Sequence, residues 1–358
     1  MSTPTPGVGS PNARRLLPYE SLAELVTIVI PARNEEAALG ECLDSILRQD
    51  YPNLQVIVVD GASIDRTPEV IKAYQEQDAR VEVINNPDSI IPKSLNLALA
   101  AARGRWLVRV DAHATIPRDY VGRAAEHLRT GYWGGVGGRK VGVGVTVAGM
   151  AIAAAMSSRF GVGNSTYHYG DRQQTVDHIP FGAYTTDVVR TLGGWNEELR
   201  VNQDFEFDFR LRAAGHQLLF DPQLAIDWTC RQSLADLFKQ YRRYGKGKSI
   251  VAMLHPASLE PRHLAAPSLV LCWFAALPLS FRRSRLTAAA TLPYIAALTV
   301  ASLSTASRVP GFSARIRVPG AFLTMHTAWG LGFWEGMLTT GTRTLGRSLS
   351  DRLKRRSS

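Results

Sequence analysis

Three acidic segments of the chain could carry chemistry on a phosphorylated substrate. They contain Asp60 in VVDGASIDRT, Asp111 and His113 in WLVRVDAHATIP, and Asp204 in NQDFEFDFRLRAAG. Residues two apart on an extended segment point the same way, so an Asp111 oxygen and a His113 nitrogen could hold one divalent cation. A carboxylate suits Mg²⁺ or Mn²⁺, and a histidine ligand shifts the preference towards Mn²⁺. Taken alone, the pair also fits a turn aspartate beside an exposed histidine.

The other two acidic segments each allow two interpretations. A carboxylate after a strand, as at Asp60, can accept hydrogen bonds from a base or a ribose hydroxyl, but it can equally cap the next helix. Asp204 could be a general base that deprotonates an acceptor hydroxyl, or a carboxylate that interacts with a helix dipole. Glu206 lies two residues further on and cannot share a helix face with Asp204, so we expect only one of them in a site.

A basic segment, QYRRYGKGK at residues 240–248, combines cations, aromatic rings and glycines. Its arginines and lysines could neutralise a diphosphate leaving group or bind lipid phosphates, or they could form a solvated basic helix face. The chain contains no GxxxxGK[ST], GxSxG or HExxH motif, which argues against P-loop NTPases, α/β-hydrolases and zincins. Its three cysteines form no CxxC pair, so neither a disulfide framework nor a zinc site is indicated.

The elements that must position these residues alternate between strands and helices. Short β-branched runs predict strands over residues 26–31, 54–59, 81–84 and 106–110. Helical spacing of apolar residues and a proline in a first turn predict helices over 35–49, 67–77 and 92–103. Alternation of this kind favours a parallel α/β sheet, whose ligands lie beyond the carboxyl ends of the strands. The glycine-rich stretch 131–184 has no clear assignment, and helices are expected again over 204–214 and 233–244.

Charge divides the chain into two parts. The 358 residues contain 41 Lys and Arg against 31 Asp and Glu, a net charge of +10, and 45% are hydrophobic. Residues 231–358 hold 19 basic and 4 acidic side chains, so they carry +15 and the preceding 230 residues carry −5. The apolar content excludes a wholly disordered chain, and an excess confined to the last third does not fit a folded nucleic-acid-binding face. We expect no nucleic-acid partner.

The basic third also contains three apolar stretches, at about residues 264–281, 286–303 and 319–340. A helix that spans a membrane needs about 20 apolar residues, with a range of about 17–25, and the first two stretches lie near the lower limit. Clustered arginines between and after the stretches favour the cytoplasmic face and anionic headgroups. We therefore predict a membrane-associated helical region with transmembrane helices, with the number and topology of spans left open. The alternative is a soluble helical tail.

In this order, the segments resemble glycosyltransferase family 2, the inverting GT-A-fold enzymes that use nucleotide sugars. The matching text is VTIVIPARNEE, VIVVDGASIDRT, IPKSLNLALAAARGRWLVRVDAHA, FGAYTTDVVRTLGGWNEELRVNQDFEFDFRLRAAG and QYRRYGKGK. The DAH and NQD variants and the apolar basic tail look most like the succinoglycan-biosynthesis ExoA type. The resemblance implies a GT-A (Rossmann-like) α/β domain, a mixed sheet flanked by helices, over residues 23–250. A disordered lead over 1–22 and a helical membrane-associated region with a basic tail over 251–358 complete the expected organisation.

The resemblance also implies roles for residues at matched positions. Pro31, Arg33 and Glu35 would line the nucleotide pocket, Asp60 would contact the uracil or ribose, and Lys93 would lie near the nucleotide sugar.

The remaining matched positions would act on the metal, the acceptor and the leaving group. Asp111 matches the first Asp of the DXD motif, and His113 stands in place of the second, so these two would bind the nucleotide sugar and Mn²⁺ or Mg²⁺. Asp204 matches the catalytic base of the ED motif, although Gln203 replaces the acidic residue before it. A QxxRW motif with Tyr for Trp would bind the leaving group or acceptor; it consists of Gln240, Arg243 and Tyr244.

The reaction that the resemblance implies is an in-line displacement by a nucleotide-sugar-dependent hexosyltransferase. We expect glucose from a UDP-sugar to be moved onto a lipid-linked oligosaccharide in exopolysaccharide or cell-envelope glycan synthesis. The enzyme would lie at the cell membrane with its catalytic domain on the cytoplasmic side. One alternative is a polyprenyl-phosphate glycosyltransferase, whose acceptor phosphate is already ionised and needs no base. A second alternative is a non-catalytic, membrane-anchored binding module on a degenerate GT-A domain.

Overall fold

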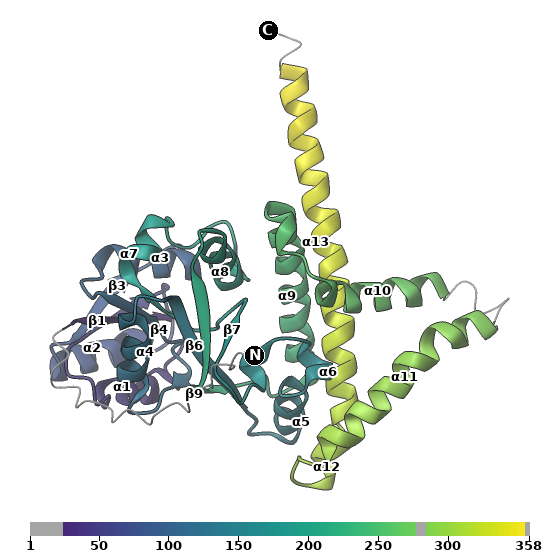
Figure 1. Ribbon diagram of the computed structural model, residues 1–358, viewed down its shortest axis with the longest axis horizontal. Helices are drawn as coiled ribbons and strands as arrows, with labels where there is room; N and C mark the ends of the chain where they lie inside the picture. Colours follow the sequence, from purple (N-terminus) through teal and green to yellow (C-terminus); the bar gives the residue numbers. More distant parts are fainter. Residues whose placement is uncertain (1–23, 277–283, 355–358) are drawn as a thin grey trace, which may run out of the picture.

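Residues 26–109 build four parallel strands with helices between them, as the sequence predicts. The computed structural model describes residues 24–276 and 284–354 (Figure 1). The strands are β1 (Val26–Ala32), β2 (Leu54–Asp60), β3 (Val81–Asn85) and β4 (Trp106–Arg109), in the spatial order β3-β2-β1-β4. The helices that connect them are α1 (Leu39–Leu47), α2 (Thr67–Gln77) and α3 (Ile91–Ala101). Strands β2 and β4 are buried along their whole length, as expected where helices cover both faces of a sheet.

Beyond β4 the sheet becomes mixed. Strand β8 (Ala183–Thr185) is antiparallel to β4 and to β6 (Trp133–Val143), and β6 is parallel to β9 (Gln217–Thr229). Strands β5 (Ala114–Thr115) and β7 (Gln174–Val176) pair with the two ends of β9. The stretch without a clear assignment therefore contains β6, whose glycines allow close approach: a Cβ at Gly138 would lie 1.7 Å from the carbonyl oxygen of Leu224.

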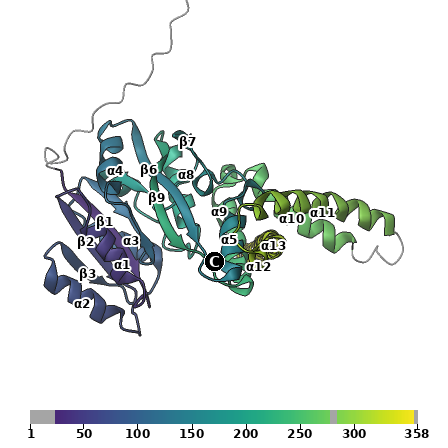
Figure 2. The same cartoon turned by 90° about the horizontal axis from the view of Figure 1, so that it is seen from below.

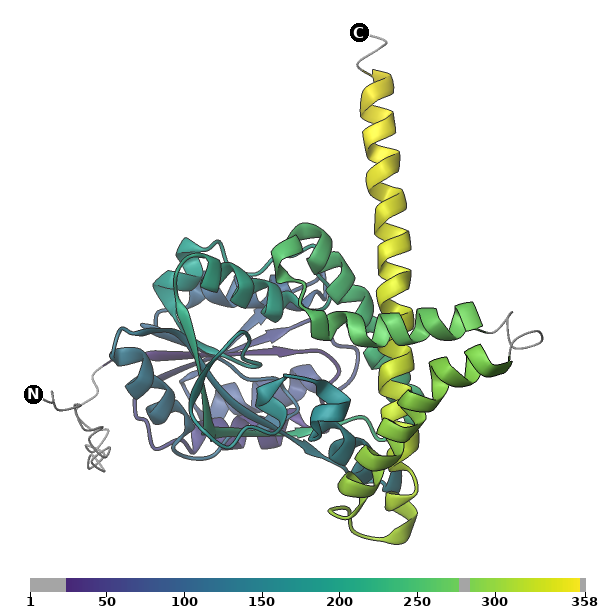
Figure 3. The same cartoon turned by 45° about the vertical axis from the view of Figure 1, so that its right-hand side comes forward.

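Short helices cover the sheet and continue into the C-terminal third. Around the sheet lie α4 (Tyr120–Arg129), α5 (Val147–Met156), α6 (Arg159–Val162), α7 (Thr186–Thr191) and α8 (Gln203–Ala213). The C-terminal helices are α9 (Leu234–Leu254), α10 (Pro261–Ala276), α11 (Ser284–Ala306), α12 (Phe312–Arg315) and α13 (Val318–Lys354). Helix α13 runs beside α9, whereas α10 and α11 project away from the sheet as two neighbouring arms (Figures 1, 2 and 3).

Glycines and one acidic residue hold α13 against α9. A Cβ at Gly245 would lie 2.1 Å from the Trp329 carbonyl oxygen, so the two backbones meet where no larger residue fits. The Glu335 carboxylate accepts hydrogen bonds from Arg242 Nε at 2.7 Å and from Lys246 Nζ at 2.9 Å. The basic segment at residues 240–248 is therefore the middle of a helix, and part of its charge is neutralised by α13.

The lengths and apolar character of the described helices can be compared with those of the predicted membrane region. Over residues 24–276 and 284–354, no helix is long and apolar enough to cross a membrane. In the third predicted stretch, Glu335 interrupts the apolar sequence of α13, and its carboxylate forms ion pairs with Arg242 and Lys246 of α9. Association of the C-terminal third with a membrane stays a prediction. Residues 1–22, part of the first apolar stretch and the basic end at 355–358 lie outside the described residues.

Candidate functional site

Backbone strain gathers in the loops that follow the strands. Five non-glycine residues have φ in the left-handed region in the described part of the chain: Asn34 at 54°, Ala62 at 56°, Ser89 at 56°, Phe181 at 51° and Asn202 at 60°. The first three follow β1, β2 and β3, and the last two line a large cavity. Side-chain-bearing residues seldom adopt this conformation, and such strain clusters at active sites. The carboxyl edge of the sheet is therefore the candidate site.

The large cavity has a volume of about 830 Å³ and lies between the sheet edge and the C-terminal helices. It joins segments that are far apart in the sequence, because β4, α8 and α9 all contribute to its lining. Six of the residues that the sequence singles out line it: Asp111, His113, Asp204, Gln240, Arg243 and Tyr244. The predicted metal, base and leaving-group residues thus line one cavity.

Arg109 binds two of the candidate carboxylates at once. Its Nε and Nη2 donate to Asp111 Oδ1 at 3.1 and 2.9 Å, and its Nη1 donates to Asp204 Oδ1. The Arg109 side chain is only 6% exposed, against 19% for Asp111 and 22% for Asp204. Burial lowers the pKa of Arg109, but the two carboxylates outweigh it and hold this pKa above its ordinary value. The guanidinium therefore stays charged and fixes both carboxylates beside each other.

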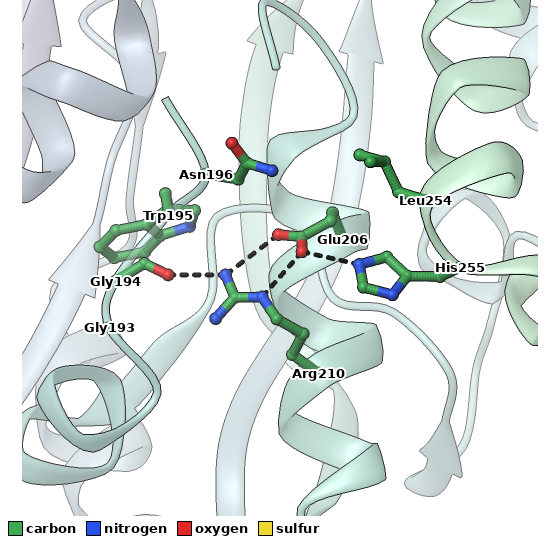
Figure 4. A pocket seen from close by; sticks show the side chains of 8 residues that line it. All are labelled: Gly193, Gly194, Trp195, Asn196, Glu206, Arg210, Leu254 and His255. Atoms are coloured by element: carbon green, nitrogen blue, oxygen red, sulfur yellow. Dashed lines mark hydrogen bonds and ion pairs between the residues drawn. The ribbon is translucent and has the colours of Figure 1, made fainter. Parts of the chain in front are cut away.

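The two acidic residues at the start of α8 point to different places. Asp204 lines the large cavity, whereas Glu206 is 2% exposed and lies in a separate pocket of about 330 Å³ (Figure 4). Glu206 accepts hydrogen bonds from Arg210 Nε at 2.7 Å and Nη2 at 3.0 Å, and it lies 3.0 Å from His255 Nε2. Arg210 also donates to the Gly194 carbonyl oxygen at 2.6 Å. Glu206 therefore joins α8 to its neighbours, and Asp204 alone is placed to act on a ligand of the large cavity.

The predicted nucleotide-binding residues lie along the same sheet edge, outside the lining of the cavity. They are Pro31, Arg33, Glu35, Asp60 and Lys93. Asp60 is paired in register with Ala32 of β1, and its carboxylate accepts hydrogen bonds from Ser63 Oγ at 2.6 Å and Ser63 N at 3.3 Å. Asp60 therefore orders the loop after β2 and does not cap α2, whose N-cap Arg66 has no side-chain capping hydrogen bond; 8% of Asp60 is still exposed. Arg33 is exposed and Lys93 pairs with Asp88.

The residues predicted to bind a metal fit a cation only in part. The described residues include no group of three or more His, Cys, Asp or Glu side chains that could hold one. Both His113 nitrogens are engaged: Trp228 Nε1 donates to Nε2 at 2.8 Å, which leaves the proton on Nδ1, 3.1 Å from Glu35 Oε1. Asp111 Oδ2 has no hydrogen-bond partner among the described residues, and its side chain faces the cavity. The chain thus fits a cation held by the Asp111 carboxylate and completed by substrate oxygens, whereas ligation by His113 requires its bond to Trp228 to break.

Sequence reasoning missed two cations of the site. Arg109 is a charged residue inside the apolar run WLVRV, two positions before Asp111, so period-two alternation could have placed the two side chains together. Lys140 lies in the unassigned glycine-rich stretch, and its Nζ is 3.7 Å from the ring centroid of Trp228 and 4.7 Å from that of Phe181. Burial lowers the pKa of Lys140 to about 8. No local pattern points to Lys140, because only the sheet pairing of β6 brings it to the cavity.

Comparisons with known proteins point to glycosyltransferases. The model of the family described as Glycosyl transferase family 2 matches residues 27–188. Succinoglycan biosynthesis protein ExoA from Rhizobium meliloti is 28% identical over 325 residues, which are 87% of this chain and 94% of that protein. Dolichyl N-acetyl-alpha-D-glucosaminyl phosphate 3-beta-D-2,3-diacetamido-2,3-dideoxy-beta-D-glucuronosyltransferase from Methanococcus voltae is 26% identical over 238 residues, covering 63% of this chain and 73% of that one.

A solved structure shares the fold. It is mannosyltransferase PcManGT from Pyrobaculum calidifontis in complex with GDP-Man and Mn²⁺, with a TM-score of 0.57 and 19% sequence identity. The similarity covers 90% of this chain and 89% of that one, so it extends from the sheet into the C-terminal helices.

Proposed function

The chain is a glycosyltransferase with a family 2 domain on a GT-A-like mixed sheet, and from that premise we propose that it inverts the sugar that it transfers. We propose that the donor is a nucleoside diphosphate sugar, with UDP-glucose as the first candidate, and that the acceptor is a lipid-linked glycan. The observation that carries the proposal is the single guanidinium of Arg109, which holds Asp111 and Asp204 together in one cavity.

The two carboxylates that Arg109 holds take different parts in the proposed reaction. Asp204 accepts the proton of an acceptor hydroxyl while that oxygen forms a bond to the anomeric carbon. The bond from the anomeric carbon to the diphosphate oxygen breaks on the opposite face, and the electron pair leaves with the nucleoside diphosphate. Lys140 and Arg243, which line the cavity, stabilise this developing charge. A divalent cation at Asp111 would supply further charge neutralisation there.

The wider setting of the reaction rests on the relatives and on the C-terminal helices. The name of the Rhizobium meliloti relative refers to succinoglycan biosynthesis, and that of the Methanococcus voltae relative describes a dolichyl-linked sugar phosphate. The first name supports exopolysaccharide or cell-envelope glycan synthesis, and the second supports a lipid-linked acceptor. Large apolar side chains on α10 and α11 are exposed, among them Phe274 at 62% and Leu292 at 58%. They support contact with a membrane surface, and we propose that the enzyme acts at the cytoplasmic face of the cell membrane.

The test of the proposed function is the substitution Asp204→Asn. Binding of the donor, measured by titration calorimetry with UDP-glucose, GDP-mannose and UDP-N-acetylglucosamine in the presence of Mn²⁺, should change little. Transfer should fall by about 10²–10⁴-fold, because the amide cannot accept the proton. Full turnover in Asp204→Asn removes Asp204 as the base.

A polyprenyl-phosphate glycosyltransferase is the second candidate function. It is favoured by four exposed arginines that line the cavity without an ion pair or a side-chain hydrogen bond among the described residues: Arg159, Arg200, Arg231 and Arg243. Such guanidinium groups suit a phosphate acceptor, which needs no base. Product on bare polyprenyl phosphate together with undiminished turnover of Asp204→Asn supports this candidate over the first.

A further inference from the structure

The lining of the large cavity changes in chemical character from one side to the other. On the sheet side it consists of charged residues held by β4, β6 and α8, such as Arg109, Lys140 and Asp204. On the other side, α5, α6 and the C-terminal helices contribute apolar and aromatic side chains: Met156, Phe160, Leu269, Tyr294, Met325 and Trp329. The polar sugar and phosphate groups of a donor would gain little from contact with this apolar side.

The tyrosine and histidine on the apolar side satisfy their hydrogen bonds within the protein. Tyr294 Oη lies 2.9 Å from His326 Nδ1, and His326 Nε2 lies 2.8 Å from the Phe160 carbonyl oxygen. Because the carbonyl can only accept, His326 carries its proton on Nε2 and the tyrosine donates to Nδ1. The Phe160 ring packs edge-on against Phe322 at 5.1 Å between centroids. These contacts join α6, α11 and α13 into a wall that offers a ligand mainly carbon surface.

Unpaired positive charge lies next to this wall. Arg159 directly precedes Phe160, and its guanidinium makes no ion pair or hydrogen bond among the described residues; it lies 5.1 Å from the centroid of the Tyr169 ring. By contrast, Arg262, which also lines the cavity, is paired with Asp177. An exposed guanidinium beside an apolar wall fits a ligand that has a phosphate at one end and a hydrocarbon chain at the other.

Apolar surface continues outside the cavity along the helices that form the wall. Leu271 and Phe274 of α10 are 53% and 62% exposed, and Ile295 of α11 is 50% exposed. Figure 3 shows these two helices leaving the body of the protein side by side. A hydrocarbon chain longer than the cavity therefore meets further apolar side chains where it leaves.

We propose that the end of the cavity between α6, α10, α11 and α13 binds the hydrocarbon chain of a lipid phosphate, with Arg159 at the phosphate. This site gives the acceptor a place in the same cavity as Asp204, so the sugar donor approaches from the sheet edge and the lipid from the helices. The inference rests on the proposed glycosyl transfer for its purpose, but binding of the lipid is measurable without any transfer.

Titration calorimetry of the full chain with farnesyl phosphate, farnesol and inorganic phosphate tests the proposal. Farnesyl phosphate should bind at least about tenfold more tightly than either of the others, because it alone satisfies both the wall and Arg159. Leu269→Asp, which places a charge on the wall, should lower the affinity for farnesyl phosphate by about tenfold or more. The control is Ser268→Asp, which adds the same charge to an exposed neighbour that does not line the cavity.

Two further variants complete the test. Arg159→Ala should lower the affinity for farnesyl phosphate to that for farnesol and leave farnesol binding unchanged. Ala265→Trp, which fills the cavity from an exposed position on α10, repeats the test of the wall without a buried charge. Equal binding by Leu269→Asp and Ser268→Asp together with unchanged binding by Ala265→Trp overturns the proposal. So does equal affinity for inorganic phosphate and farnesyl phosphate.

The outcomes separate this inference from the proposed function. Sugar transfer to a soluble glycan without binding of farnesyl phosphate refutes the lipid site alone. Binding of farnesyl phosphate that follows the expected pattern, without transfer from any nucleotide sugar, refutes the proposed transfer alone.

Discussion

The closest backbone approach between α9 and α13 should make Gly332 intolerant of even one added methyl group. A Cβ at Gly332 would lie 1.9 Å from the carbonyl oxygen of Arg242. Ordinary contact begins at about 3.4 Å, so the two helices must separate by about 1.5 Å to admit the methyl group. That movement also stretches the bonds from Glu335 to Arg242 and Lys246.

The expected loss of stability follows from two opposing effects. Replacing a glycine within a helix by alanine gains about 1 kcal/mol of helix propensity. Overpacking costs about 1–3 kcal/mol, and the upper value applies because a backbone oxygen cannot rotate away. We therefore expect Gly332→Ala to lower the free energy of unfolding by about 2 kcal/mol, which corresponds to roughly 4–8 °C in Tm for a chain of about 150–250 residues and somewhat less for a longer one.

Gly320→Ala is the matched control, because it makes the same change in the same helix. A Cβ at Gly320 would meet only Leu234 Cδ1, at 3.6 Å, which is an ordinary contact. Scanning calorimetry and urea unfolding should show an unchanged or slightly higher Tm for Gly320→Ala and a clear fall for Gly332→Ala. Equal shifts in the two variants, or a stabilised Gly332→Ala, refute the close packing of α13 on α9.

Two further predictions concern the cations of the cavity. Burial lowers the pKa of Lys140 to about 8, so its charge is present below that pH and is lost as the pH rises through it. If that charge binds the donor, kcat/KM should fall about tenfold for each pH unit above roughly 8, and Lys140→Arg should remove this dependence in a pH–rate profile. Arg243 lines the cavity whereas Arg242 pairs with Glu335, so Arg243→Ala should raise a substrate KM by about tenfold without a change in Tm. Arg242→Ala should lower Tm without a change in KM. The same response from both variants contradicts their different placement.

Elements with strong local patterns were predictable from the sequence. Helix α2 begins at Thr67 and ends at Gln77, as expected, because its proline at the first turn and its apolar spacing are local signals. Strand β6 was not predictable, because five of its eleven residues are glycine, which local propensity disfavours in a strand. It forms because β8 and β9 pair with it on both sides and because its glycines let Leu224 approach.

The residues of the site also divide into those that local motifs predict and those that depend on contacts between distant parts of the chain. The order of the motifs predicted the carboxylates and the QYRRYGKGK segment as parts of a site. In the structure, Asp111 and Asp204 line the same cavity as three residues of that segment: Gln240, Arg243 and Tyr244. The role of Arg109 was hidden because Asp204, its second partner, lies 95 positions along the chain. No pattern within QYRRYGKGK predicts that Gly245 packs against the Trp329 backbone, because that contact depends on α13.

Charge balance in the cavity gives a role to part of the basic third of the chain. Below a pH of about 8, the charges of Arg109 and Lys140 cancel those of Asp111 and Asp204, so this cluster is neutral before a donor binds. In the proposed reaction, the negative charges of a diphosphate are then neutralised by groups outside this cluster. Of the four unpaired arginines that line the cavity, Arg231 and Arg243 belong to the basic third. These two positive charges of the basic third therefore face the candidate site, whatever use a membrane surface makes of the others.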